Sequence, residues 1–290
     1  MLALACENEM LASACENGDF DSLSRILKRG ESQLDTLTAK LPFGTRTTPL
    51  IATVYHDHVD CCRLLVDAGA ALNIRVGDSD ETALHVACSK GKVHVADILI
   101  NAGADLDAED VLGRSPLFMS SLCNQPACLQ LLIVSGASIE QPMRTLNPGA
   151  TPIYPVAMAG NIKCVALLCE AGANVNAETV DGAAPLMAAC QEGHMETVML
   201  LSSYGAKRKR SRFRGCKPLY GTWADDLALR SGNVELVQWL KQSVSYGPLQ
   251  HIDVLTPERT VELLRSGQYS PVAGGRDSPA ELARTRTRTR

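Results

Sequence analysis

Aromatic residues are scarce in this sequence, and it has neither a long apolar run nor a basic N-terminus. Only 4% of its 290 residues are Phe, Trp or Tyr, although 46% are hydrophobic. A core of mainly Ala, Leu, Val, Ile and Cys suits thin, closely stacked helices better than a bulky globule. No segment reaches the roughly eighteen successive apolar residues of a membrane span. Glu7 and Glu9 lie where a secretory signal would carry basic residues. We therefore expect a soluble intracellular protein without a membrane span.

Charge is unevenly distributed along the chain. Residues 1–200 carry 12 Lys and Arg against 24 Asp and Glu, whereas residues 201–290 carry 16 against 8. The two parts of the chain are therefore expected to attract different partners.

One sequence pattern occurs five times. Its copies begin at Thr48, Thr82, Ser115, Thr151 and Ala184, at intervals of 34, 33, 36 and 33 residues. The second copy reads TALHVACSKGKVHVADILINAGA. Within a copy, a Thr that can cap a helix is followed by a short helix, a Gly-containing turn and a second helix with an apolar face. Helix pairs this short need contact with their neighbours to be stable.

This pattern resembles the ankyrin repeat, which has a period of about 33 residues and a Thr-Pro-Leu-His-x-Ala signature. The resemblance implies an all-α solenoid of helix-turn-helix units joined by hairpin fingers. Fainter copies begin at Glu9, Trp223 and Gly247, and a fragment begins at Ser278. The expected total is eight repeats and a terminal fragment.

The expected organisation has five parts. They are an N-terminal capping repeat with a long loop (1–46), five regular repeats (47–206), a basic loop (207–222), degenerate C-terminal repeats (223–283) and a disordered basic tail (284–290). Pro155, early in a first helix, removes a backbone hydrogen bond, and the hairpin before that helix is three residues longer than usual. Together they predict either a local distortion or a partner-specific bulge.

The segment HDHVDCC imitates a metal site, because His56, His58, Cys61 and Cys62 are all possible ligands. The repeat register favours packing instead. Cys61 shares its column with Cys128 and Cys164, and another column holds Cys15, Cys88 and Cys190. The eleven cysteines are thus interpreted as small apolar core residues in a reducing compartment, and no metal or cofactor is expected.

His85 lies three residues before Cys88, so the two side chains can be neighbours on a helix and could be imagined as a catalytic base and thiol. The resemblance implies a structural role, in which this His bonds to the preceding Thr and the adjacent turn. No phosphate-binding loop, G-x-S-x-G elbow or H-E-x-x-H helix occurs in the sequence. We therefore expect no enzymatic activity and no small-molecule substrate.

The segment KRKRSRFRGCK has no packing role in the repeat register. Three interpretations stay open: a nuclear-import signal, a solvated loop that balances the acidic repeats, and contact with nucleic acid or anionic lipid, which the lack of interleaved aromatics makes weaker. Ser211 resembles a phosphorylation site of basophilic kinases. The import-signal residues would be Lys207, Arg208, Lys209, Arg210, Arg212 and Arg214.

The resemblance further implies protein binding through the first helices and the fingers. The expected contact residues are Asp78, Asp80, Glu81, Asp110, Arg114, Arg144, Asn147, Glu178 and Asp181. Most are acidic, so a partner with a basic face is expected to bind a monomeric chain. The expected location is the cytoplasm, and also the nucleus if the basic segment is an import signal.

The sequence leaves three classes of function to be compared. The first is a binding scaffold or regulator. The second is a substrate-recognition subunit of a ubiquitin ligase, which is disfavoured because TPERTVELL at 256–264 reads as a repeat and not as an adaptor box. The third is an enzyme carrying an ankyrin array, for which the repeats leave no room.

Overall fold

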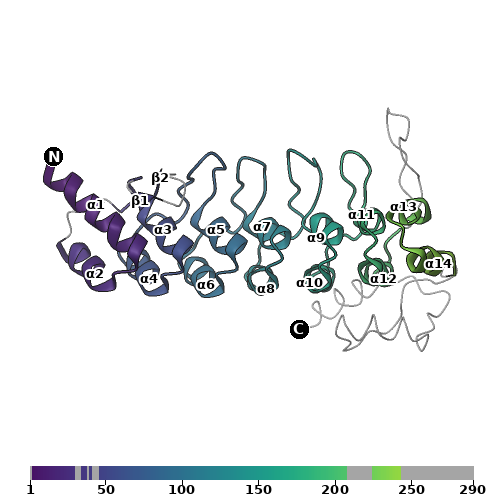
Figure 1. The fold of residues 1–290 in the computed structure, drawn as a ribbon. Coiled ribbons are helices and arrows are strands. Elements are labelled where there is room, and N and C mark those ends of the chain that lie inside the picture. The colour runs from purple at the N-terminus through teal and green to yellow at the C-terminus, as the bar shows by residue number, and fades with distance from the viewer. Residues whose placement is uncertain (1, 30–33, 38, 41–45, 208–223, 243–290) are drawn as a thin grey trace. The chain divides into compact units, whose positions relative to one another are not determined.

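The computed structural model describes residues 2–29, 34–37, 39–40, 46–207 and 224–242. Tertiary contacts divide the chain into two units, Met1–Ser138 and Ile139–Arg290. Each unit is a stack of paired antiparallel helices, with hairpins on the side of the first helix of each pair (Figure 1). The expected repeat from Gly247, the fragment from Ser278 and the tail 284–290 lie outside the described residues.

The described part of the first unit contains four helix pairs. The first helices pack in series, α1 on α3, α3 on α5 and α5 on α7, and the second helices form a parallel row from α2 to α8. The elements of the pairs are α1 (Leu2–Asn17) and α2 (Phe20–Arg29), α3 (Pro49–His56) and α4 (Val59–Asp67), α5 (Ala83–Lys90) and α6 (Val93–Asn101), and α7 (Pro116–Leu122) and α8 (Pro126–Val134).

A short antiparallel sheet precedes α3 and is an addition to the expected all-α architecture. β1 (Ala39–Lys40) pairs with β2 (Arg46–Thr47), so that Ala39 faces Thr47. β1 also contacts α1 and α3, and Ala39 is fully buried. Thr48, which directly follows β2, has the extended backbone typical of a helix N-cap and begins α3.

The second unit contains three helix pairs among the described residues. Its first helices pack as α9 on α11 and α11 on α13, and α10 packs on α12. The elements are α9 (Ile153–Ala159), α10 (Ile162–Glu170), α11 (Pro185–Glu192), α12 (Met195–Ser203), α13 (Ala224–Ser231) and α14 (Val234–Gln242). Helices α13 and α14 lie where the sequence analysis expected the faint copy after residue 223.

The helix starts follow from capping chemistry. The Oγ1 atom of Thr48 accepts the Ile51 N–H at 3.3 Å, and the Oγ atom of Ser115 accepts the Phe118 N–H at 3.2 Å. In both repeats proline occupies the first helical position, where a backbone N–H would have no partner within the helix. Helix α5 ends at Gly91, whose φ of 70° is the left-handed conformation that glycine adopts without strain.

The fourth copy, which begins at Thr151, starts its first helix differently from the copies at Thr48 and Ser115. Helix α9 begins one residue later, at Ile153, and the Thr151 hydroxyl is buried without a hydrogen-bond partner. Pro155 explains the shift, because it has no N–H to donate to the Thr151 carbonyl. The Tyr154 N–H donates to that carbonyl instead, at 2.9 Å, which makes a tighter turn. Of the two readings of Pro155, the structure therefore shows a local distortion.

Cysteines fill matched positions in the core, as the repeat register predicts. Cys15, Cys88 and Cys190 of the first helices are fully buried, and Cys128 and Cys164 are fully buried in the second helices. Burial raises the pKa of Cys164 to about 11, because the thiolate cannot be solvated there. These side chains pack as small apolar groups that allow close approach of neighbouring helices.

Candidate functional site

Four hairpin fingers carry the expected contact residues. In the first unit these are the first finger (residues 71–81) and the second finger (residues 105–114). In the second unit they are the third finger (residues 139–150) and the fourth finger (residues 174–183). All four are connections between a second helix and the next first helix.

The first finger presents two carboxylates to solvent. Val76 and Glu81 pair across the hairpin through both backbone hydrogen bonds, at 3.1 and 3.3 Å. Asp78 and Asp80, between them, are exposed, and Asp80 adopts a φ of 55°, which Asp tolerates better than most residues. The expected contact residues Asp78 and Asp80 are therefore accessible to a partner.

Asp110 of the second finger is buried, which contradicts its expected role as a contact residue. Its Oδ1 atom accepts the backbone N–H groups of Leu112 and Arg114 at 2.9 and 2.8 Å. Its Oδ2 atom accepts from the Arg114 guanidinium, with the Nε and Nη2 atoms each at 2.6 Å. The Asp110 side chain is 0% exposed and that of Arg114 is 14% exposed. The physical reason is that the carboxylate turns back to close the hairpin instead of facing solvent.

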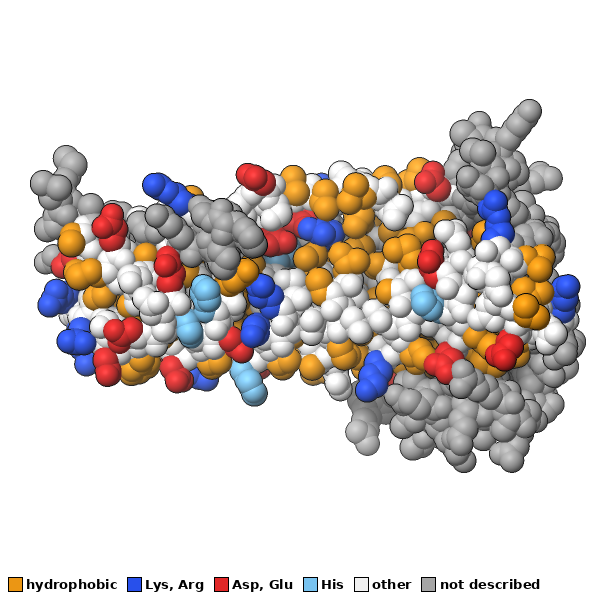
Figure 2. All heavy atoms as spheres, in the orientation of Figure 1, with side chains coloured by type: hydrophobic (Ala, Val, Ile, Leu, Met, Phe, Trp, Pro, Cys, Tyr) orange, Lys and Arg blue, Asp and Glu red, His pale blue; other side chains and the backbone are white. Residues whose placement is uncertain are grey.

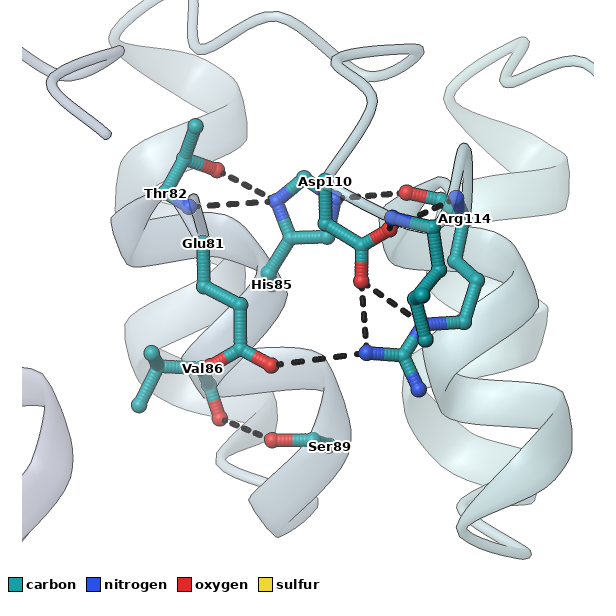
Figure 3. A network of polar contacts seen from close by, with 8 residues as sticks. Glu81, Thr82, His85, Val86, Ser89, Asp110 and Arg114 are labelled. Atoms are coloured by element: carbon teal, nitrogen blue, oxygen red, sulfur yellow. Dashed lines mark hydrogen bonds and ion pairs between the residues drawn. The ribbon is translucent and has the colours of Figure 1, made fainter. Parts of the chain in front are cut away.

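Arg114 is likewise held inside the first unit (Figure 3). Its Nη2 atom lies 4.0 Å from the Oε1 atom of Glu81 on the first finger, and the Glu81 side chain is 25% exposed. The Val111 N–H also donates to the Ser79 carbonyl, at 3.0 Å. The first two fingers are therefore joined by backbone and side-chain contacts, and Arg114 and Glu81 serve that junction.

His85 connects the same two repeats from below the fingers (Figure 3). Its Nδ1 atom accepts the Thr82 N–H at 3.2 Å and lies 2.8 Å from the Thr82 hydroxyl. The Nε2 atom therefore carries the proton, and it donates to the Arg114 carbonyl at 3.0 Å. Burial is the main reason that the pKa of His85 is lowered, so the ring is neutral at neutral pH. Both ring nitrogens therefore make hydrogen bonds that hold the fold, which is the structural role that the resemblance implied.

The two fingers of the second unit are also joined by a backbone hydrogen bond, in which the Val180 N–H donates to the Pro148 carbonyl at 2.8 Å. Within the fourth finger, the Thr179 N–H donates to the Ala183 carbonyl at 3.0 Å. Arg144 and Asn147 are exposed on the third finger, and Glu178 and Asp181 on the fourth. These four expected contact residues are accessible, and their contact with a partner stays a prediction.

Apolar fingertips are the functional candidates that the sequence analysis missed. Val111 is 54% exposed, Leu146 is 78% exposed and Val180 is 73% exposed. Figure 2 shows hydrophobic side chains on the finger edge of each unit. The register contained the signal for two of them, because Val111 and Val180 each lie four residues before the first position of the next helix pair, Ser115 or Ala184.

The histidine and cysteine residues of HDHVDCC are dispersed by the fold. Cys61 and Cys62 are buried in α4, and the exposed His56 stacks on His58 with ring centroids 5.8 Å apart. The Nε2 atom of His58 lies 3.1 Å from the Glu16 carbonyl oxygen. Within the described ranges, no group of three or more His, Cys, Asp or Glu residues is arranged to hold a metal ion.

Most of the basic segment lies outside the described residues. This applies to Arg208, Lys209, Arg210, Ser211, Arg212 and Arg214. Lys207 is described: it is exposed, and its N–H donates to the Asn176 side-chain oxygen at 2.7 Å. Among the helices that are described, none is long and apolar enough to cross a membrane.

Comparison with known proteins supports the repeat assignment. A family profile for ankyrin repeats in three copies matches residues 10–110, 73–143, 117–212 and 156–248. The chain is 38% identical over 101 residues to the tyrosine-protein kinase HTK16 of Hydra vulgaris, covering 35% of this chain and 13% of the kinase. It is 27% identical over 202 residues to the E3 ubiquitin-protein ligase XBAT32 of Arabidopsis thaliana, covering 61% of this chain and 39% of the ligase.

Among solved structures, the ankyrin repeat domain of Bcl-3 superposes with a TM-score of 0.67 at 25% identity. The match covers 80% of this chain and 97% of that domain. Ankyrin repeats are in general non-enzymatic modules that bind other proteins, although some proteins that contain them are named as kinases or ligases. The repeated helix pairs, the fingers and these matches together show that the chain belongs to the ankyrin-repeat family.

Proposed function

We propose that the chain is a non-enzymatic scaffold or regulator that binds partner proteins through its fingers and the adjoining ends of its first helices. The observation that carries this proposal is that the finger backbones are joined by hydrogen bonds while side chains on the same fingers are exposed. Backbone hydrogen bonds join Val111 to Ser79 in the first unit, where Asp78 is exposed, and Val180 to Pro148 in the second unit, where Glu178 is exposed. A surface that is already ordered loses little conformational entropy on binding.

Acidic side chains favour a partner with a basic face. Asp78 and Asp80 are exposed in the first unit, and Glu178 and Asp181 in the second, whereas Arg144 is the basic residue among the exposed finger positions proposed for contact. Complementary charge raises the association rate and excludes acidic competitors, more than it raises affinity. Binding is therefore expected to weaken as the salt concentration rises.

Affinity capture with charge-neutralised variants tests the proposal. The finger variant carries Asp78→Asn, Asp80→Asn and Asp181→Asn, and the matched control carries Asp60→Asn, Asp67→Asn and Asp97→Asn on second helices, where these residues are exposed. We expect the finger variant to lose a defined set of proteins that the wild type and the control both retain. Equal capture by all three, or loss only with the control, would place binding elsewhere and refute the proposal.

A second candidate, a substrate-recognition subunit of a ubiquitin ligase, is favoured by the similarity to XBAT32 over 202 residues. It predicts that ligase subunits are captured together with a substrate, and that added chain increases ubiquitination of that substrate. Capture without any ligase subunit would leave the scaffold as the function. In either case we propose that the chain works in the cytoplasm and the nucleus.

A further inference from the structure

The tips of the third and fourth fingers form one backbone-linked platform within the second unit. The Val180 N–H donates to the Pro148 carbonyl at 2.8 Å. Gly149, with a φ of 84°, makes this approach possible, because a Cβ atom there would lie 3.2 Å from the Val180 nitrogen and 3.4 Å from the Glu178 carbonyl oxygen. The platform is thus held by main-chain contacts and does not depend on the side chains at its surface.

Those surface side chains are apolar. Leu146 is 78% exposed, Val180 is 73% exposed and Pro148 is also exposed. Single exposed apolar residues are ordinary, whereas several on two bonded tips provide a surface that a partner can desolvate. Figure 2 shows hydrophobic side chains on this edge of the second unit.

The backbone of Leu146 gives a second, independent observation. Its φ of 58° lies in the left-handed region, where the Cβ atom of a leucine is crowded and where Gly or Asn fits more easily. Neither the exposed side chain nor the strained backbone of this residue helps the fold. A residue that is unfavourable in both respects points to a role outside folding.

Charged residues beside the platform indicate the chemistry of the occupant. Glu178 and Asp181 are exposed on the fourth finger. Arg144 is the exposed basic residue of the third finger. Carboxylates therefore outnumber basic groups around the apolar tips, so basic residues on the occupant would be attracted.

We infer that this platform binds an amphipathic segment of another protein, in which large apolar side chains are flanked by Lys or Arg. The apolar side chains contact Leu146 and Val180, and the basic ones face the carboxylates. This inference rests on the proposed function, since it assumes binding at the fingers, and it narrows that function to one class of partner.

A random-peptide display library, panned against the full chain, supplies the probe. We expect enrichment of peptides with two or more large apolar residues and an excess of Lys and Arg. The double variant Leu146→Asn/Val180→Thr should bind a synthetic copy of an enriched peptide at least about tenfold more weakly, because it removes apolar contact area. The matched control is Val134→Thr, which replaces a valine that is 80% exposed at the end of α8.

Thermal unfolding separates binding from folding, because Asn tolerates the left-handed conformation and Leu146→Asn should leave the midpoint unchanged or raise it. If the double variant binds as tightly as wild type, the platform inference is wrong while the proposed function stands. Enrichment of acidic peptides, or of no class of peptide, overturns the inference in the same way. Concentration-dependent dimerisation that the double variant abolishes would make a second copy the occupant, and so would also overturn it.

Discussion

The Nε2 atom of His85 lies 3.0 Å from the carbonyl oxygen of Arg114, so a buried ring of one repeat closes the finger of the next. Its Nδ1 atom is occupied by Thr82 in the same repeat. Both bonds require the neutral ring with its proton on Nε2. The hydrogen bond of His85 to the next repeat therefore depends on the protonation state of its ring.

Replacing His85 should change how stability depends on pH. Burial lowers the pKa of His85 below its ordinary value of 6.5. As the pH falls through that value, the unfolded chain takes up a proton that the folded chain does not, and the free energy of unfolding decreases by up to about 1.4 kcal/mol per pH unit. Wild type should thus lose more stability than His85→Gln between about pH 7.5 and 5.5, as measured by urea unfolding.

His56→Gln, at an exposed position, is the control that shows whether the loss of any histidine has the same effect. Parallel stability curves for wild type and His85→Gln would show that the buried ring is not the titrating group.

Asp110→Asn should destabilise the first unit by about 2–4 kcal/mol, because it leaves the guanidinium of Arg114 largely buried without its carboxylate. The Arg114 side chain is only 14% exposed. Asp80→Asn, at an exposed position with a φ of 55° that Asn tolerates, should change stability by less than about 0.5 kcal/mol. Equal effects in chemical unfolding would mean that Asp110 does not hold the finger.

Native cysteine reactivity should follow burial. Cys6 is exposed and Cys123 is half-buried, whereas Cys15, Cys88 and Cys164 are fully buried. A maleimide should modify Cys6 and then Cys123 in the folded protein, and the buried thiols only after unfolding, because burial also raises the pKa of Cys15 and Cys164. Peptide mass mapping over time measures this order. Early modification of Cys164 would contradict the packing described for α10.

The basic segment predicts a localisation phenotype. Glu in place of Lys207, Arg208, Lys209 and Arg210 should shift a fluorescent fusion from nucleus to cytoplasm, because an acidic import receptor would be repelled. Ser211→Asp should shift it in the same direction, since a negative charge amid the arginines would mask the signal. Lys90→Glu and Lys92→Glu on α5 and its turn serve as the control. Unchanged distribution of the segment variants would refute the import interpretation.

The sequence predicted the helix pairs well because one physical constraint recurs in each copy. A cap, a short apolar helix, a turn and a second apolar helix must occupy fixed positions for neighbours to cover one another, and the buried columns of Cys88 and Cys128 follow from that register. Pro155 was identified as a disturbance for the same reason. The register could not show that helix α9 starts after Pro152, because that depends on which N–H reaches the Thr151 carbonyl.

The fingers were harder to predict, because register assigns a residue to a hairpin without giving the direction of its side chain. Asp110 closes its own turn through the Arg114 N–H, and Thr179 does the same at the equivalent position, where its hydroxyl accepts the Ala183 N–H at 3.1 Å. Asp110 and the exposed Asp78 differ in this respect, because only the Asp110 side chain accepts the backbone N–H group four residues later. The sequence analysis did not consider such hairpin-closing hydrogen bonds. The exposed Leu146 was missed because the prediction considered only polar contact residues.

Site-specific photo-cross-linking tests finger-mediated binding most directly. A photoreactive amino acid would replace Asp80, Asn147 or Asp181 on the fingers, or Asp60, Asp97 or Lys163 on the second helices, all of which are exposed. After irradiation in cell lysate, we expect discrete cross-linked products of the same partner proteins from the finger positions and none from the helix positions. Products from the second helices alone would contradict binding through the fingers.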